Sequence, residues 1–298
     1  MSDNATTPAT DSFLAHRNLL FTVAYEMLGS AADAEDVLQE TWLRWAEVDL
    51  STVLDERAYL VRITSRQALN RLRSLNRRKE SYVGPWLPEP LLTAPDVAED
   101  IELAESLSTA LMLVLETLSP TERAVFVLRE VFDVSYDEIA ASVDKTPAAV
   151  RQIAHRARQH VDARRPRSTV TRSQTKAALE SFQRALETGD PQNLLDILAP
   201  DVVLLADGGG IKRATARPIL GSDKVARYLA GGLGKVAGRY LFVDTVVNGQ
   251  PALAIHLDDE FDGIMTLRVE EGRITGLYFV RNPEKLTHVD SETQFTLR

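Results

Sequence analysis

The sequence contains no cysteine among its 298 residues. Disulfides, thiolate nucleophiles and cysteine-based zinc sites are therefore excluded. The five histidines do not suggest a metal site either, because none of them are spaced as metal ligands would be. His155 and His160, for example, are five positions apart and would diverge on a helix. We expect no bound metal, no cofactor and no catalytic residue of these types.

Long apolar runs are also lacking. No stretch approaches the ~20 residues that a membrane span requires. The N-terminal segment MSDNATTPATDS is polar and does not have the basic-then-apolar order of a signal peptide. We therefore expect a cytoplasmic protein without a membrane partner, in which residues 1–12 are disordered.

The net charge of −9 would disfavour nucleic-acid binding if it were evenly distributed, but the charges are segregated. Every charge within 57–79 is positive, and Asp162 is the only acid within 145–167. By contrast, 33–56 is acidic and contains a single base, Arg44. Blocks of opposite sign indicate several partners of different charge.

The stretch 133–161 reads as two short helices joined by a tight turn. Thr146 is a good N-cap, and Pro147 stands at the first helical position, where its missing N–H costs nothing. Apolar residues recur at helical spacing in the second helix and leave the other faces polar. This is the layout of a helix-turn-helix whose second helix enters a DNA major groove. A plain helical hairpin with a solvated basic face is the alternative. The polar residues near the groove would be Lys145, Arg151, Gln152, His155 and Arg156.

Helices are expected over most of 13–79, before a proline-rich segment at 82–96. Four prolines in that segment preclude a helix or an inner strand, so it reads as a linker. Its apolar residues, including Trp86 and Leu87, indicate that it docks on another part of the protein. One helix is expected over 97–118, with Ser119 capping the next.

From Arg172 onward the pattern changes to two helices followed by strands. The second helix is expected to end at Ala199-Pro200. The pairs Asn248-Gly249 and Glu271-Gly272 are hairpin signals. Helices followed by a meander predict an α+β domain, a curved sheet wrapped against helices. The strand-like runs are 202–205, 240–243, 251–257, 263–269 and 273–280.

Three segments occur in a recognisable order: DAEDVLQETWLRW, AYLVRITSRQALNRLRSLNRR, and LSPTERAVFVLREVF followed by the helix-turn-helix. With WLPEP, DGGG and NPEKL, they resemble bacterial extracytoplasmic-function sigma factors that carry a C-terminal SnoaL-like domain. The resemblance implies a multi-domain fold with two all-α sigma domains, a helical bundle and a helix-turn-helix, and then an α+β SnoaL-like (NTF2-like) cone domain. The implied boundaries are 13–80 for sigma region 2, 81–105 for the linker, 106–165 for region 4 and 172–298 for the SnoaL-like domain.

The same resemblance implies an alternative sigma factor, which is not an enzyme. It would bind core RNA polymerase at the clamp helices and flap, recognise −35 and −10 promoter elements and open the promoter DNA. A helix that binds the basic clamp coiled coil needs acids and apolar anchors. The residues of this helix that fit are Asp36, Gln39, Glu40 and Trp42, and one of Trp42 and Trp45 is expected to be core.

The segment AYLVRITSRQALNRLRSLNRR would be the helix that contacts the −10 element, and it must attract single-stranded, negatively charged DNA. Its polar residues recur on one helical face, which allows phosphate contact and base reading together. Asn70 stands where relatives often have Asp. The preceding loop, 48–56, is where such factors hold a flipped −10 base. The implied −10 residues are Arg62, Arg66, Asn70 and Arg73, and the implied −35 residues are those named above.

The resemblance further implies that the C-terminal domain regulates the sigma half in cis, so no separate anti-sigma factor is expected. Three short motifs would form the contact between linker and domain. The alternative is a ligand sensor, or a weak isomerase- or cyclase-like enzyme, that binds a small hydrophobic ligand with Asp207, Asp244 or His256 as proton carrier. The regulatory contact would comprise Trp86, Leu87, Pro88, Glu89, Pro90, Asp207, Gly208, Gly209, Gly210, Asn282, Pro283, Lys285 and Leu286.

Overall fold

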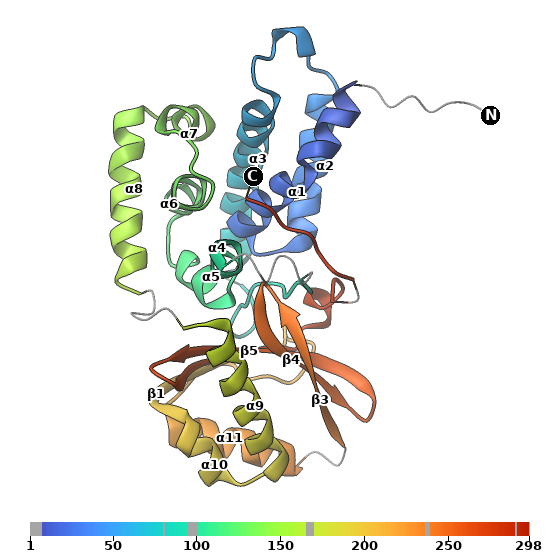
Figure 1. The fold of residues 1–298 in the computed structure, drawn as a ribbon, viewed down its shortest axis with the longest axis vertical. Coiled ribbons are helices and arrows are strands. Elements are labelled where there is room, and N and C mark those ends of the chain that lie inside the picture. The colour runs from blue at the N-terminus through green and yellow to red at the C-terminus, as the bar shows by residue number, and fades with distance from the viewer. Residues whose placement is uncertain are drawn as a thin grey trace, which may run out of the picture. The chain divides into compact units, whose positions relative to one another are not determined.

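The computed structural model describes residues 8–79, 81–93, 101–164, 170–235, 239–289 and 291–297. Its chain divides into two compact units (Figure 1). Unit 1 contains residues 1–80, 114–164 and 294–298, and unit 2 contains residues 81–113 and 165–293. The chain thus passes between the two units more than once.

Unit 1 begins with a bundle of three helices. These are α1 (Pro8–Leu28), α2 (Ala31–Trp45) and α3 (Glu56–Lys79), with a short 3-10 turn η1 (Leu50–Thr52) before α3. Gly29 ends α1 with φ +69°, as expected of a helix C-cap. Ser30 caps α2 by accepting a hydrogen bond from the Asp33 N–H at 3.2 Å.

Helix α1 starts earlier than the sequence indicates, because residues 8–12 of the segment expected to be disordered are helical. The reason is a tertiary contact: the indole Nε1 of Trp45 donates to the Ala9 carbonyl at 2.8 Å. Trp45 is fully buried and packs on Tyr59 with ring centroids 5.7 Å apart. Trp45 is therefore the core tryptophan of the expected pair, and its polar edge fixes the start of α1.

The second part of unit 1 contains the predicted helix-turn-helix. It comprises α6 (Pro120–Phe126), a π-helical turn η2 (Val127–Val131), α7 (Tyr136–Val143) and α8 (Pro147–Asp162). Thr146 caps α8 and Pro147 occupies its first turn, as predicted. Asp144 closes α7 in the left-handed conformation, with φ +54°. The two-helix reading of 133–161 is confirmed.

The C-terminal tail also belongs to unit 1. Phe295 is buried beside the aromatic rings of α1, with centroids 5.9 Å from Phe21 and 5.7 Å from Tyr25. The backbone N–H of Thr296 donates to Thr22 Oγ1 at 3.1 Å. The last residues of the chain therefore end on the first helix.

Unit 2 is built on a six-stranded sheet with the order β2-β1-β6-β5-β4-β3. Only the β1–β6 pair is parallel among its pairings. Asn248 and Glu271 have positive φ and are each followed by a glycine with positive φ, which confirms both hairpins. The strands are β1 (Leu198–Asp207), β2 (Ile219–Leu220), β3 (Tyr240–Val247), β4 (Gln250–Leu257), β5 (Glu260–Glu270) and β6 (Arg273–Val280).

One face of the sheet is covered by α9 (Arg172–Thr188), α10 (Pro191–Ile197) and α11 (Ser222–Lys235). Helix α11 and strand β2 were not predicted. The expectation that a helix runs to Ala199-Pro200 is wrong, since α10 ends at Ile197 and these two residues lie in β1. The pairing register of β1 shifts between Leu198 and Val203, and an irregular pairing tolerates the missing proline N–H.

The opposite face of the sheet holds the linker. Leu87 is fully buried there in a cluster with Val247, Ala252 and Tyr278, and Leu113 packs against the same cluster. The single helix expected over 97–118 is two helices within the described residues, α4 (Ile101–Ser106) and α5 (Thr109–Leu115). Their break falls at Ser108, whose hydroxyl accepts from the Leu111 N–H.

Within the described parts of the chain, no helix is both long enough and apolar enough to cross a bilayer.

Candidate linker-binding site and nucleic-acid interface

Asp207, the last residue of β1, is fully buried and faces the linker. Its Oδ1 accepts from the Tyr82 hydroxyl at 2.6 Å, and its Oδ2 accepts from the Leu87 backbone N–H at 2.9 Å. Its own turn contributes a further donor, the Gly209 N–H at 3.0 Å. A buried carboxylate is tolerated only when it is paired and hydrogen-bonded, and Asp207 meets both conditions.

Lys285 supplies the opposite charge. Its Nζ lies 2.7 Å from Asp207 Oδ2 and donates to the Leu87 carbonyl at 2.6 Å. The same ammonium stands 4.2 Å from the ring centroid of Trp86 and 4.8 Å from that of Tyr82. These aromatic rings add cation–π attraction to the ion pair. Lys285 therefore binds the carboxylate of β1 and the backbone and aromatic rings of the linker at once.

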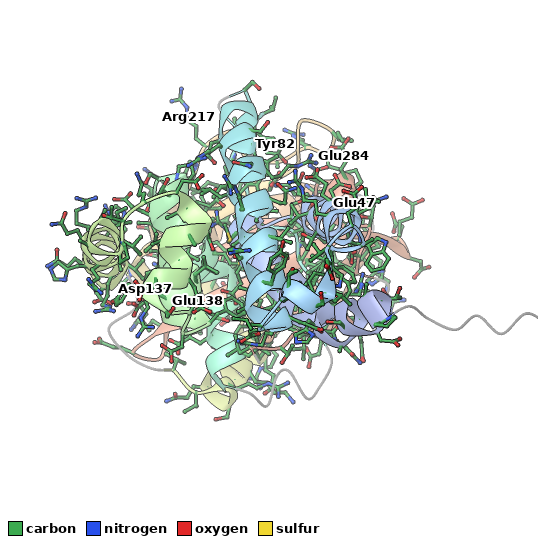
Figure 2. All side chains as sticks on the ribbon, turned by 90° about the horizontal axis from the view of Figure 1, so that it is seen from above. Glu47, Tyr82, Asp137, Glu138, Arg217 and Glu284 are labelled. Atoms are coloured by element: carbon green, nitrogen blue, oxygen red, sulfur yellow. The ribbon has the colours of Figure 1, made fainter. Side chains whose placement is uncertain are left out.

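Tyr82 closes the network. Asn282 Nδ2 donates to the Tyr82 hydroxyl at 2.9 Å, while that hydroxyl donates to Asp207. Burial raises the pKa of Tyr82, and its hydrogen bond to the Asp207 carboxylate raises it further. Glu284 adds to this effect and lies near Tyr82 in Figure 2. The phenol is thus held in its neutral, donating form.

The glycines of the DGGG turn permit a close approach, as the sequence indicates. Gly209 has φ +61°, and a Cβ there would overlap the side chain of Asn282. A Cβ on Gly208 would overlap the Lys212 carbonyl. Arg281 and Asn282 directly follow β6, and the backbone N–H groups of both donate to the Asp207 carbonyl. The turn brings NPEKL against DGGG without a side chain between them.

A second group of contacts holds the linker further along. The Leu91 N–H donates to Asn248 Oδ1 and the Asn248 N–H donates to the Leu91 carbonyl, both at 2.9 Å. The Thr93 N–H donates to the Val246 carbonyl at 3.0 Å. The linker thus adds β-like bridges beside the β3–β4 hairpin.

Most of the expected linker contacts come together in this linker-binding site, which we define as Tyr82, Trp86, Leu87, Asp207, Asn282 and Lys285. Pro88, Glu89, Pro90 and Leu286 are also buried, whereas Gly210 and Pro283 are exposed. Sequence reasoning missed Tyr82 and Asn248. Asn248 was interpreted only as a turn residue, and nothing in its local pattern indicates a linker partner.

The four expected −10 residues, Arg62, Arg66, Asn70 and Arg73, have exposed side chains on α3. The guanidinium of Arg62 lies over the Tyr59 ring, 4.6 Å from its centroid. Arg73 Nη1 lies 3.5 Å from Asn70 Oδ1. This is a positively charged surface with an aromatic side chain, the combination that single-stranded nucleic acid requires.

The expected −35 residues lie on α8 and the turn before it. Arg151 stacks against Tyr136 of α7, with its guanidinium carbon 5.5 Å from the ring centroid. Arg158 is tied to Glu130 by two hydrogen bonds. The exposed side chains of the set are Lys145, Arg151, Gln152, His155 and Arg156.

Within unit 1 the two parts that carry the expected −10 and −35 residues are in contact, because α3 packs against α7 and α6. Arg66 pairs with Asp144, in the turn of the helix-turn-helix, at 3.0 Å. Arg123 of α6 is fully buried, donates through Nε and Nη2 to the Glu26 carbonyl of α1, and pairs with Glu116. We call this the closed arrangement of unit 1.

The expected polymerase-binding residues lie along α2. Asp36, Gln39 and Glu40 are exposed, and Asp36 pairs with Arg71 at 2.8 Å. Trp42 is half-buried and packs on Phe13, with ring centroids 5.3 Å apart. Helix α2 thus has an exposed acidic face beside a half-buried tryptophan.

The three expected proton carriers of the C-terminal domain do not converge. Asp244 pairs in register with Leu253, on the face that α9 and α11 cover, whereas His256 pairs with Leu241 on the other face. Asp207 is engaged by the linker. This geometry gives no catalytic pair.

Comparisons with known proteins agree with this arrangement. The profile of Sigma-70 region 2 matches residues 13–78, and that of Sigma-70, region 4 matches residues 108–161. The chain is 36% identical over 293 residues to the ECF RNA polymerase sigma factor SigJ of Mycobacterium tuberculosis, covering 92% of each chain. It is 30% identical to the probable ECF RNA polymerase sigma factor SigI of the same species, covering 96% of this chain and 97% of that one.

Among solved structures, the crystal structure of M. tuberculosis SigJ aligns with a TM-score of 0.72 at 32% identity, covering 94% of this chain and 98% of that chain. Sigma factors are transcription regulators, so the expectation that this chain is not an enzyme is confirmed at the level of the family. With two helical sigma regions followed by a helix-and-sheet domain, the chain belongs to the ECF RNA polymerase sigma factors and is of the SigJ type.

Proposed function

We propose that this sigma factor reads −10 DNA with Arg62, Arg66, Asn70 and Arg73 and reads −35 DNA with α8, while its acidic α2 binds the polymerase clamp helices. Exposure of these side chains and their sign of charge support the assignment. On α8, residues near the helix start reach deepest into a groove, so Arg151 and Gln152 contact base edges. Region 4 then binds the flap.

The closed arrangement must open for this function. The −35 and −10 elements are separate sites along the DNA, and α8 and α3 each have to reach their own site. Arg66 and Asp144 cannot stay within 3.0 Å of each other while α3 and α8 occupy those two places. Free protein in this arrangement therefore has its −10 surface partly covered by α7, and promoter binding includes the cost of separating them.

The C-terminal domain acts in cis, in place of a separate anti-sigma factor. The observation that carries this proposal is the buried pair Asp207–Lys285, which holds the linker through Tyr82 and Leu87. A linker bound in this way ties the chain segment between regions 2 and 4 to the domain. The tail adds a second tie, because Phe295 ends on α1.

Transcription by core polymerase on a promoter of this factor tests the proposal with two truncations. Ending the chain after Thr293 removes only the tail, and ending it after Arg281 also removes NPEKL. Both are expected to alter transcription, with the larger change after Arg281. The substitution Phe295→Ala should reproduce the shorter truncation, and Glu292→Ala, an exposed neighbour, serves as its control. Unchanged transcription from both truncations would mean that the C-terminal domain does not regulate the sigma regions.

A ligand-sensing role for the C-terminal domain remains the second sequence-based hypothesis. The opposed directions of Asp244 and His256 do not favour it over regulation through the linker. Thermal shift of the full chain with small hydrophobic ligands separates the two, since only a sensor is stabilised by such a ligand.

A further inference from the structure

Tyr136, the half-buried first residue of α7, contacts two arginines from different elements of region 4. The guanidinium carbon of Arg129 in η2 lies 4.9 Å from its ring centroid, and that of Arg151 in α8 lies 5.5 Å from it. Both distances are within the ~6 Å over which an aromatic ring attracts a cation. A capping box between Ser135 and Glu138 fixes the backbone at this point. The ring therefore has a defined place beside the helix that is expected to enter the major groove.

Arg129 is fixed by contacts within its own turn. Its Nη1 lies 2.9 Å from Asp133 Oδ1 and donates to the Val134 carbonyl at 3.0 Å. Asp133 has φ +48°, in the left-handed region that Asp adopts more readily than most residues. This conformation turns the chain between η2 and α7. Arg129 is therefore held in place without Arg151, and its contact with the Tyr136 ring does not depend on DNA.

Arg151 differs from Arg158, which lies two turns further along α8 on the same face. Arg158 donates two hydrogen bonds to the Glu130 carboxylate, and this ion pair occupies part of its guanidinium. Arg151 forms no ion pair with any residue that the structure describes, and its side chain rests on the Tyr136 ring instead. Of these two arginines, only Arg151 thus keeps its donors free of a carboxylate.

The kind of partner matters because all five N–H donors of a guanidinium lie in its plane. A carboxylate uses two of these donors, whereas an aromatic ring attracts the charge and leaves the donors available. Guanine presents O6 and N7 in the major groove, and an arginine binds both atoms at once. A side chain that is held before binding also loses less conformational freedom on binding. The contact with Tyr136 therefore prepares Arg151 for a guanine without occupying its donors.

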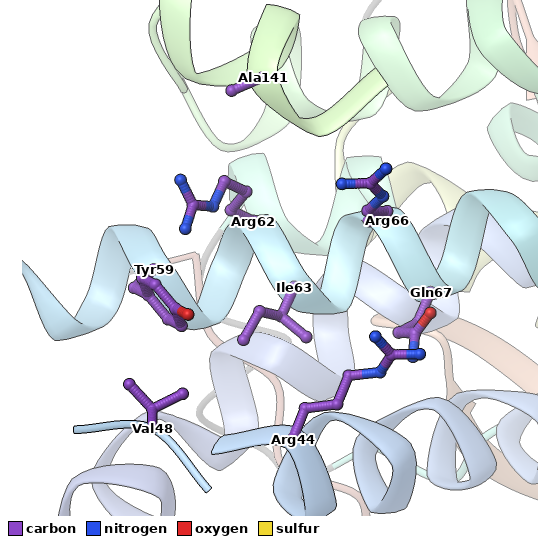
Figure 3. A pocket seen from close by; sticks show the side chains of 8 residues that line it. All are labelled: Arg44, Val48, Tyr59, Arg62, Ile63, Arg66, Gln67 and Ala141. Atoms are coloured by element: carbon purple, nitrogen blue, oxygen red, sulfur yellow. The ribbon is translucent and has the colours of Figure 1, made fainter. Parts of the chain in front are cut away.

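A similar contact occurs on α3, the other helix that is expected to contact DNA. The guanidinium of Arg62 lies over the Tyr59 ring of the same helix, 4.6 Å from its centroid (Figure 3). Arg62 also forms no ion pair within the described parts of the chain. On both helices, an arginine assigned to DNA rests on a tyrosine and not on a carboxylate. This repetition favours a role for the ring in preparing the arginine.

We propose that Tyr136 is a positioning residue for promoter reading, whose ring holds the Arg151 guanidinium for contact with one guanine of the −35 element. The inference rests on the proposed −35 role of α8. It goes beyond that role because it assigns the specificity at one base pair to a residue outside the recognition helix. Tyr136 itself touches no base, and its effect passes through Arg151 alone.

The test uses the full chain with core polymerase on a promoter of this factor whose −35 element is randomised. Sequencing of barcoded transcripts gives the base preference at each position. Arg151→Ala identifies the base pair that Arg151 reads, where the preference for guanine should fall roughly five- to hundredfold. Tyr136→Leu should lower the preference at the same base pair by roughly two- to fivefold, the range for an exposed cation–π contact. Preferences at the other −35 positions should not change.

Three further variants separate positioning from packing. Tyr136→Phe keeps the aromatic ring and should retain the guanine preference. Tyr228→Leu is the matched control, the same exchange at a tyrosine of α11 that is 38% exposed, and should leave every position unchanged. The double variant of Tyr136→Leu and Arg151→Ala should lose no more preference than Arg151→Ala alone, because the ring acts only through that arginine.

Three results would overturn the positioning role alone. One is an unchanged guanine preference in Tyr136→Leu where Arg151→Ala loses it. Another is an equal loss in Tyr136→Phe. The third is a loss that spreads over the whole −35 element or adds to that of Arg151→Ala, which would mean that Tyr136 acts through the packing of region 4. An unchanged preference in Arg151→Ala itself would contradict the proposed function of α8, and the inference with it.

Discussion

The linker-binding site and the contact between α3 and α7 differ most in burial. Asp207 is fully buried and Lys285 is 7% exposed, and both are hydrogen-bonded. The side chains of Arg66 and Asp144 are 56% and 69% exposed. Breaking a buried pair leaves an uncompensated charge at a cost of about 3–5 kcal/mol, whereas an exposed pair contributes about 0–1 kcal/mol. We therefore expect the linker-binding site to stay intact and the contact between α3 and α7 to open.

Arg123 lies between these extremes. It is buried and satisfies the end of α1, so the closed arrangement is a specific packing of two regions. Its partners are one backbone carbonyl of region 2 and Glu116 of region 4. Opening therefore leaves Arg123 paired with Glu116, and the helix end exchanges its guanidinium for water. Because Arg123 keeps Glu116 as a partner, separating the two regions costs less free energy than leaving a buried charge unpaired.

The largest effect is expected from Lys285→Met. It removes the cation beside buried Asp207 and should destabilise unit 2 by about 3–5 kcal/mol. Lys224→Met, at an exposed position of α11, is the matched control. Denaturant unfolding measures the difference. A loss of unfolding free energy below about 1 kcal/mol would mean that the Asp207–Lys285 pair contributes no more than an exposed ion pair. The linker-binding site and the contact between α3 and α7 would then not differ in strength.

A smaller effect is expected from Arg123→Lys. Lysine keeps a charge near Glu116 but cannot reproduce the fork that holds the Glu26 carbonyl, so the contact between regions should weaken by about 1–3 kcal/mol. Binding of promoter DNA to the free protein should then increase. Arg57→Lys controls for the same exchange at an exposed site. Unchanged or weaker binding would mean that Arg123 does not oppose opening.

Asp144→Ala should have a still smaller effect. It removes the exposed partner of Arg66 and should raise affinity for single-stranded −10 DNA by roughly two- to fivefold, since such pairs contribute below about 1 kcal/mol. The increase should shrink at high salt, which screens the pair. Asp137→Ala, also exposed on α7, removes the same charge without this contact. An equal increase in both variants would indicate general charge repulsion only.

The smallest effect is expected from acid. Burial alone would raise the pKa of Asp262, but hydrogen bonds and charges from Arg281 and Lys212 outweigh it and hold the pKa below its ordinary value. The stabilisation is thus complete above the unfolded pKa of about 3.9 and is lost as the pH falls through the lower folded pKa. Asp262→Asn should remove this part of the acid dependence of unit 2, measured by unfolding at a series of pH values.

Local patterns predicted the elements whose causes are local. The caps at Ser119 and Thr146 and the turn at Asn248 follow from residue chemistry that acts within a few positions, and they are confirmed. The missed features depend on distant partners. Trp45 extends α1 through a carbonyl 36 residues away in sequence, and Asn248 holds a linker residue 157 positions away. No periodicity in the sequence encodes either contact.

The same distinction applies to the site residues. The charge blocks predicted which side chains of α2, α3 and α8 face solvent, because unpaired charges remain exposed. They could not predict that Arg66 meets Asp144, since the packing of α3 on α7 depends on shape over two domains. The WLPEP, DGGG and NPEKL motifs located the linker contact, but Tyr82 lies outside all three and donates one of its shortest hydrogen bonds.

Hydrogen exchange of the free protein and of its complex with core polymerase tests the central contrast directly. In both states, the backbone N–H groups of Leu87, Leu91 and Thr93 should stay protected by their hydrogen bonds to Asp207, Asn248 and Val246. In the complex, α7 should lose protection where it leaves α3. Loss of protection in the linker, with α7 unchanged, would contradict the account.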